Sequence, residues 1–461
     1  MQSLAILALL ICLSFAFVKI PLKKFYKEPL AASNSTSPLM TELLSSSDLQ
    51  NNLNWVYSAK IYVGSPPKLF TVVIGTGAPF LWIPSKRCQN VCHEASNYFD
   101  PYSSSTYKNL GQSNRITYDF SNFVEGDLSQ ETFYIGDDYA LTIKNQVFTL
   151  VHKDSGMDFL NADGVLGLTY GSISGYPTFL ENLRSQGQIS QKIFSVYLHD
   201  NDFAGSNYDG SAIIFGGYDL ASYAQSTEIK YIDVYQDDGL WNLQVSNVRV
   251  NNVPIPTRTY YALFDVGSTF NFIPKVVYDA IYNQLSAAGS CLLNNGFIEC
   301  NCYDYPLGSY PSISFVFGGK YTFSLEPEHY FYRYRKMCTL LFYTGLDYWL
   351  FGTPFLRKYY TIFDAEFLQI GFAIAKNWKT TKFIDILGPE SDLIDEGKME
   401  NIKNEAQAEE KAMENRSQSS TNALYWVLSG VLLGFLSGFL YHSYKIKKEN
   451  PQEIYYQKIQ A

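Results

Sequence analysis

The stretch LFTVVIGTGAPFLWIPS (residues 69–85) combines an apolar strand pattern, a glycine turn and a second apolar strand pattern. The stretch YALFDVGSTFNFIP (residues 261–274) repeats this design, with Asp265 at the position that Gly75 occupies in the first copy. Each copy is followed at a similar distance by a hydrophobic segment that contains glycine, GVLGL in the first half and WLFGT in the second. This repeat predicts two lobes of one topology.

The composition of the chain indicates an all-β fold. Its 461 residues are enough for two lobes with separate cores. From about residue 54 to residue 376, short apolar, β-branched and aromatic runs alternate with turn residues, and helical patterns such as PKVVYDAIYNQLSAAG (residues 274–289) are short. The formal net charge of −9 argues against nucleic acid as a partner, because phosphates would be repelled.

Both ends of the chain carry long apolar segments. The N-terminal run predicts a secretory signal peptide. The segment ALYWVLSGVLLGFLSGFLY is uncharged and has the length of about 20 residues that a bilayer core requires. We expect this order: signal peptide (1–16), leader (17–53), N-terminal β lobe (54–240), C-terminal β lobe (241–387), acidic stalk (388–422), transmembrane helix (423–441) and cytoplasmic tail (442–461).

The residues around the expected membrane helix predict its orientation and packing. Lysines follow the helix at once, which indicates a single-pass type I protein of the secretory or endolysosomal system or the cell surface. Gly430, Gly434 and Gly438 would form a helix face with little side-chain bulk, which predicts a homodimer unless glycine is simply frequent there. The sequons at Asn34 and Asn415 predict glycosylation outside the lobes.

The cysteines indicate disulfides. Six of the seven remain once Cys12 leaves with the signal peptide, an even number in an oxidising compartment. Cys88 and Cys92 are close enough in sequence to close a small loop. Six cysteines allow 15 pairings, so the sequence leaves the others open. We expect no metal site and no cofactor. The other four cysteines lie in the second half of the chain: Cys291, Cys300, Cys302 and Cys338.

Two facing turns would bring residues 75 and 265 together at a lobe interface, a common place for a ligand cleft. If both residues were aspartates, like-charge repulsion would make them share one proton. One carboxylate could then deprotonate a water while the other donated a proton to a peptide carbonyl. Here only Asp265 is an acid.

Several further blocks, in order, carry a resemblance to a known family: FDPYSSSTYKNL, ADGVLGL, KIFSVYL, GSAIIFGGYD and FGTPFLRKYYTIFD. With the two turns, they resemble the pepsin-like aspartic proteases over roughly residues 18–376. The resemblance implies a bilobal pepsin-like fold, an inhibitory leader beginning at VKIPLKKF, and Asp265 as the remaining catalytic acid. It implies these substrate contacts: the flap residue Tyr118 and the turn residues Thr76, Gly77, Gly267 and Ser268.

The sequence departs from the family pattern at the site. Gly75 replaces the first catalytic aspartate, Ala78 replaces a hydroxyl residue that would bind it, and Val266 replaces the Thr or Ser that would complete a mutual hydroxyl clasp. Asp119 and Ser121 stand at flap positions where the family usually has glycine. These changes predict a pseudoprotease.

Three interpretations follow from these departures. The first is a membrane-anchored, catalytically impaired protein that keeps a cleft for an extended peptide or protein ligand. The second is an active aspartic endopeptidase, if Gly75 is a sequence error or is compensated, for example by Asp119. The third is a structural surface protein. Without a second acid there is no self-processing, so we also expect the leader to be retained.

Overall fold

The structure is a computed structural model of the chain. The chain divides into two units, residues 1–386 and 387–461. The expected stalk, membrane helix and tail, and both sequons, lie outside the described residues, and no helix among those described is long and apolar enough to span a membrane. The structure describes residues 17–25, 56–118, 122–157, 160, 162–171, 175–199, 210–235, 239–257, 260–294, 296–334, 336–346 and 348–376.

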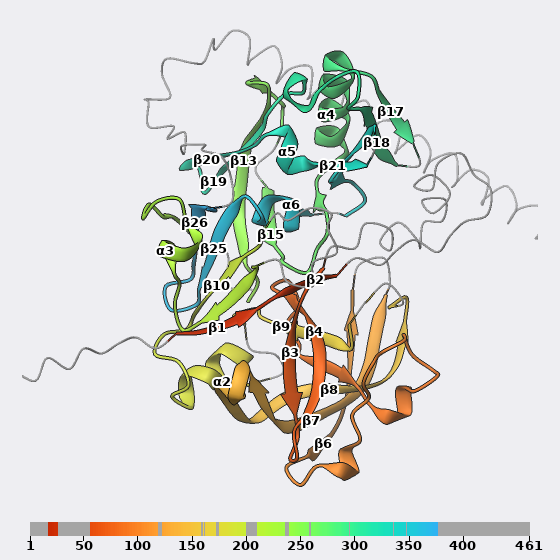
Figure 1. The fold of residues 1–461 in the computed structure, drawn as a ribbon, viewed down its shortest axis with the longest axis vertical. Coiled ribbons are helices and arrows are strands. Elements are labelled where there is room, and N and C mark those ends of the chain that lie inside the picture. The colour runs from red at the N-terminus through yellow and green to blue at the C-terminus, as the bar shows by residue number, and fades with distance from the viewer. Residues whose placement is uncertain are drawn as a thin grey trace, which may run out of the picture. The chain divides into compact units, whose positions relative to one another are not determined.

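The first half of the chain forms an eight-stranded sheet that carries the first turn (Figure 1). Its order is β2 (Lys23–Phe25), β3 (Val56–Val63), β4 (Lys68–Gly75), β9 (Gly164–Gly167), β5 (Trp82–Pro84), β8 (Leu141–Ser155), β7 (Phe123–Ile135) and β6 (Lys108–Thr117). Strand β4 is central, so its last four residues are all buried. Helix α2 (Phe179–Ser185) is also in this half.

The second half forms an eight-stranded sheet and a smaller four-stranded sheet. Helix α4 (Lys275–Ala288) is the helix that the sequence pattern predicts here. Two shorter helices are α5 (Pro327–Tyr330) and α6 (Thr353–Leu356). The larger sheet has the order β20 (Tyr321–Leu325), β19 (Ile313–Phe317), β13 (Asn242–Val250), β15 (Tyr260–Phe264), β24 (Trp349–Phe351), β16 (Asn271–Phe272) and β23 (Phe342–Tyr343), with β14 (Val253–Pro254) beside β13; the smaller has β17 (Cys291–Asn294), β18 (Phe297–Asn301), β22 (Met337–Leu340) and β21 (Phe331–Tyr334).

A six-stranded sheet joins strands from both halves. Its edge strand comes from the expected leader, and the side chains of Ile20 and Leu22 are buried in the core. In Figure 1 this strand, β1, is drawn in red. The order is β1 (Val18–Pro21), β11 (Ala212–Phe215), β10 (Ile193–Tyr197), β25 (Tyr359–Asp364), β26 (Gln369–Ile374) and β12 (Lys230–Asp233), with α3 (Leu220–Tyr223) following β11.

Candidate functional site

The two repeated turns are built on matching strand arrangements. Strand β4 pairs in parallel with β9, which places Gly75 beside Gly167. Strand β15 pairs in parallel with β24 in the same way, and the N–H of Asp265 donates to Phe351 O. Both turns therefore follow the end of a buried central strand. The repeated topology that the sequence predicts is confirmed.

The turns meet at the carboxylate of Asp265. Its Oδ1 accepts hydrogen bonds from the N–H groups of Gly77 (3.0 Å) and Gly267 (2.8 Å), one from each turn. The hydroxyl of Thr76 is 3.5 Å from the same oxygen. Hydrogen bonds from backbone N–H groups stabilise a charged carboxylate. The structure thus brings together four residues that the sequence assigns to the site.

A buried hydroxyl connects the two turns from one side only. Thr76 Oγ1 donates to Phe264 O (2.7 Å) and accepts from the N–H of Val266 (3.0 Å). Both Thr76 and Val266 are fully buried. Because valine has no hydroxyl, the second turn cannot return these bonds. Only the first turn therefore holds the other turn through a side-chain hydroxyl.

Gly75 lies directly opposite the second turn. Its Cα is 3.3 Å from the position that a Cβ at Gly267 would take. A Cβ at Gly75 itself would lie 3.1 Å from Ala78 Cβ and 3.3 Å from Val165 Cγ1, and Gly75 does not have a positive φ. The backbone therefore does not require glycine at this position.

Tyr118 lies at the end of the hairpin formed by β6 and β7, which we call the flap hairpin. Its hydroxyl accepts a 2.6 Å hydrogen bond from Trp82 Nε1. Burial raises the pKa of Tyr118, and the negative charge of Asp265 adds to the shift. This coupling places the phenol within the electrostatic reach of the carboxylate. The flap positions Asp119 and Ser121 lie outside the described residues.

Ser268 is part of the second turn but uses its hydroxyl locally. Its N–H donates to Asp265 O (3.2 Å), and its hydroxyl donates to Phe270 O (2.9 Å). These bonds shape the loop that follows the turn. The hydroxyl is thus directed to its own loop rather than to the carboxylate of Asp265.

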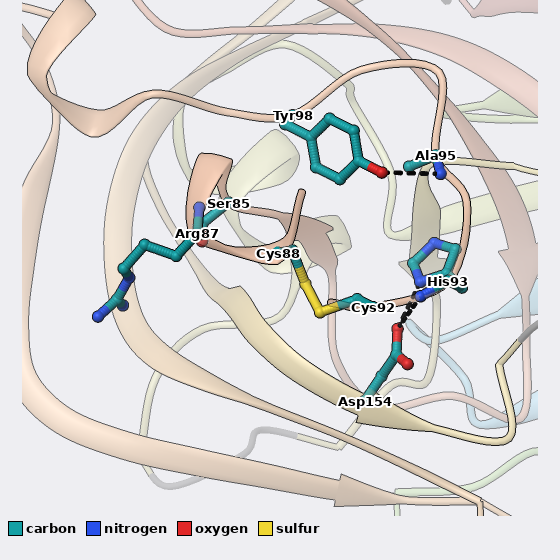
Figure 2. Close-up of a disulfide and its surroundings, with 8 residues drawn as sticks. All are labelled: Ser85, Arg87, Cys88, Cys92, His93, Ala95, Tyr98 and Asp154. Carbon is teal, nitrogen blue, oxygen red and sulfur yellow. Dashed lines mark hydrogen bonds and ion pairs between the residues drawn. A yellow bond between two sulfur atoms is a disulfide. The ribbon is translucent and has the colours of Figure 1, made fainter. Parts of the chain in front are cut away.

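All six cysteines of the lobes form disulfides, and the structure settles the pairing that the sequence leaves open. The short loop is closed by Cys88–Cys92, next to a histidine that the sequence analysis did not single out (Figure 2). This residue, His93, is buried and contacts Asp154. The only signal in the sequence is its position directly after Cys92. The other pairs are Cys291–Cys300 and Cys302–Cys338.

Comparisons with known proteins agree with this architecture. The model of the eukaryotic aspartyl protease family matches residues 56–375. The chain is 31% identical to pepsin II-2/3 of Oryctolagus cuniculus over 345 residues, which cover 72% of this chain and 84% of the relative. It is 32% identical to pepsin A of Bos taurus (72% and 87% covered) and 31% identical to cathepsin D of Chionodraco hamatus (78% and 96%). This chain therefore belongs to the eukaryotic aspartyl protease family, with its mostly β, two-lobed pepsin-like fold.

Proposed function

We propose that this chain is a membrane-anchored, catalytically impaired member of its family that retains a peptide-binding cleft between its lobes. The observation that carries the proposal is Gly75. Two neighbouring acids that share a proton divide into one acid and one base. Asp265 alone can orient a water molecule, but no acid at position 75 protonates the leaving group.

The surroundings of Gly75 support the loss of catalysis. The nearest atoms to a side chain at this position belong to Ala78 and Val165, which have no ionisable group. Losing one member of a cooperating catalytic group costs about four to six orders of magnitude in rate. An active enzyme would need another acid, such as Asp119, to take over.

A small pocket beside the first turn supports a retained cleft. Ligand clefts are lined mostly by apolar and aromatic side chains with a few polar groups. The pocket is lined in part by Phe80, Gly167 and Tyr176, and all of its lining residues belong to the N-terminal lobe.

The membrane anchor and the cell-surface or endolysosomal location rest on the sequence. The segment 423–441, followed by lysines, supports one membrane-spanning helix with the lobes on the luminal or extracellular side. A fixed cleft of this kind would hold an extended peptide or protein segment near the membrane. Pairing through Gly434 and its neighbours would place two clefts side by side.

The catalytic part of the proposal is tested with full-length protein in detergent at acid pH. We expect no difference in protein digestion between the wild type and Asp265→Asn. Gly75→Asp is expected to raise the rate at least about 1,000-fold, because it restores the acid pair. Ala78 and Val165 need to move by only a few tenths of an ångström to admit the Cβ of this side chain. Wild-type digestion that Asp265→Asn abolishes would overturn the proposal.

The binding part is tested with a statine-type peptide, whose hydroxyl occupies the place of the attacking water. We expect calorimetry to detect binding to the wild type and weaker binding to Asp265→Asn. A matched control is Asp279→Asn, which changes an exposed acid on α4 that pairs with Lys275. No binding to any of the three proteins would favour a structural surface protein, and equal affinity for all three would place the binding site away from Asp265.

A further inference from the structure

An uncharged edge strand ends one side of the small four-stranded sheet in the C-terminal lobe. The sheet has the order β17, β18, β22 and β21, and β17 pairs with no second strand in the part of the chain that the structure describes. In Figure 1, β17 lies at the outer margin of this sheet. Its four residues are Cys-Leu-Leu-Asn (Cys291–Asn294), so none of its side chains carries a charge. One side of β17 is therefore open to another strand.

Both leucines of β17 are exposed. Leu292 is 67% exposed and Leu293 is 53% exposed. Because successive side chains of a strand point to opposite faces, this edge has apolar surface on both faces. Exposed edges are usually protected by charged side chains or bulges. The edge strand β6 has Lys108, Arg115 and an irregular register, whereas β17 keeps a regular register with β18. The comparison indicates that β17 is an interaction surface.

The hydrogen bonds between β17 and β18 show which backbone groups of β17 face outward. The N–H of Asn301, at the end of β18, donates to Ser290 O, just before β17. Along an antiparallel pair, bonded and non-bonded positions alternate. Leu292 therefore also bonds to β18, while the N–H and C=O groups of Cys291 and Leu293 point to the open side. These outward groups are arranged symmetrically about Leu292.

We propose that β17 is a self-association edge, to which a second copy of this chain adds its own β17 in antiparallel orientation about a two-fold axis at Leu292. Cys291 of one copy would then exchange two backbone hydrogen bonds with the partner's Leu293, and the reverse pair would exchange two more. The two Leu292 side chains would lie directly opposite each other, which covers the apolar surface that each exposes alone. A two-fold contact of this kind closes with two copies.

Charge favours a second copy over the expected stalk of the same chain as the occupant of this edge. The chain has a formal net charge of −9, so two copies repel each other except through surfaces without charge. Strand β17 is such a surface. The acidic sequence of residues 388–422 would instead place carboxylates beside two leucines, which costs free energy of desolvation.

The contact is small, so the proposed membrane anchor strengthens it. Stable interfaces bury about 1,200–2,000 Å². A pair of four-residue strands provides less than this. Two copies held on one membrane have a high effective concentration, so a weak contact is sufficient. The inference rests on the proposed function for this tether alone, since the strand contact uses only residues of the C-terminal lobe.

Disulfide crosslinking of the full-length protein, in lipid vesicles and in concentrated detergent solution, tests the proposal. In the proposed register, the cysteines introduced by Leu292→Cys have Cα atoms about 4.5 Å apart, a distance that a disulfide spans. We expect mild oxidation to give a covalent dimer at least about tenfold faster than in a matched control, because the contact raises the local thiol concentration. The control is Phe367→Cys, at a position that is 71% exposed and lies between β25 and β26 of another sheet.

Two outcomes of this experiment would overturn the proposal. One is equal crosslinking of Leu292→Cys and Phe367→Cys, which would show unspecific collision. The other is a thiol at position 292 that reacts with maleimide but gives no dimer in either medium. Such a result would leave the edge to a different occupant.

Gly434→Ile separates the strand contact from pairing of the expected membrane helices, because it adds bulk to the glycine face. Crosslinking through Leu292→Cys should persist in this background. Its loss in both media would mean that helix pairing alone brings the copies together, and would overturn the strand contact. Crosslinking in detergent that is absent in vesicles would support the strand contact and contradict the membrane tether of the proposed function.

A mixture of two cysteine variants tests the register without changing Leu292. The two-fold pairing places Ser290 of one copy opposite the partner's Asn294. A mixture of Ser290→Cys and Asn294→Cys proteins should therefore give a covalent dimer, whereas each variant alone should give little. Equal crosslinking by the separate variants would contradict the antiparallel register. This comparison remains decisive if Leu292→Cys fails to fold.

Discussion

The two turns share one backbone plan and differ in the chemistry they carry. The second turn supplies the carboxylate of Asp265, whereas the first supplies the Gly77 N–H that donates to this carboxylate and the Thr76 hydroxyl that donates to Phe264 O. Positions 75 and 78 of the first turn are glycine and alanine, so neither carries an ionisable or hydroxyl group. The difference teaches that the contacts between the two turns do not depend on a matching pair of acids. The two lobes can be compared further through the packing, the buried charges and the hydrogen bonds around each turn.

The largest expected effect comes from the glycine beneath each turn. A Cβ at Gly167 would lie 2.4 Å from Ala78 O and 2.5 Å from Phe80 O. In the C-terminal lobe, a Cβ at Gly352 would meet equivalent carbonyl oxygens at 2.4 and 2.3 Å. Gly167→Ala and Gly352→Ala should each lower the free energy of unfolding by at least about 3 kcal/mol, measured by urea titration, because a backbone carbonyl cannot move aside cheaply.

A glycine in open space provides the control for these variants. A Cβ at Gly308 would have no neighbour within 4 Å. Gly308→Ala should therefore change the free energy of unfolding by less than about 0.5 kcal/mol. A large loss at Gly352 with little loss at Gly167 would show that the lobes are no longer equivalent beneath their turns.

Buried charge distinguishes the lobes more sharply than their backbones do. In the C-terminal lobe, Lys358 Nζ lies 2.5 Å from Glu326 Oε2, and the lysine side chain is 1% exposed. Burial alone would raise the pKa of Glu326, but hydrogen bonds from His329 and Lys358 and the lysine charge outweigh it and lower the pKa below 4.5. The described part of the N-terminal lobe buries the His93–Asp154 pair instead.

Glu326→Gln should cost about 3 kcal/mol at pH 7, since it leaves the Lys358 charge buried without its partner. The folded pKa of Glu326 is depressed, so its contribution is present above pH 4.5 and is lost as the pH falls below that value. Urea titrations at pH 7 and pH 3 should therefore differ less for the variant than for the wild type. Asp279→Asn, in the exposed Lys275 pair, should change stability by under about 1 kcal/mol. A comparable loss in both variants would contradict this account.

The frame of the site is predictable from sequence because its signals are local. An apolar strand, a glycine turn and a later hydrophobic-glycine segment predict the pairing of β4 with β9 and of β15 with β24. The difference between Gly75 and Asp265 is likewise visible when the two stretches are compared. What the sequence does not predict are contacts set by register. Cys300, for example, lies opposite both Cys291 and Cys338, and it is bonded to Cys291.

Long-range burial is also hidden from the sequence. The leader strand β1 carries Ile20 into the hydrophobic core, and Leu22 directly after it is also buried there, although the leader pattern looks basic. His93 pairs with Asp154 only because β8 places the two side chains together. Both depend on partners more than 50 residues away, which no local periodicity encodes.

A smaller effect is expected from the hydrogen bonds by which the Thr76 hydroxyl joins the two turns. Thr76→Val would leave Phe264 O and the N–H of Val266 buried without this partner. We expect a loss of about 2 kcal/mol in the free energy of unfolding, the usual cost of unsatisfied buried groups. Thr76→Ser retains the hydroxyl and should recover most of the loss. An equal loss in both variants would mean that the methyl group of Thr76, not its hydroxyl, stabilises the junction.

The smallest effect is expected from a substitution that adds a hydrogen bond from the second turn to the first. Val266→Thr adds a hydroxyl at the position that mirrors Thr76, within a junction where Ile74 O lies 3.4 Å from the Cβ position of Gly267. If the backbones are still equivalent, this hydroxyl donates to Ile74 O, and urea titration shows a gain of about 0.5–1 kcal/mol. A loss instead would mean that the junction has relaxed around valine, so that Gly75→Asp alone would not rebuild a working pair. The sign of this small change therefore tells whether the backbone of the second turn still mirrors that of the first at position 266.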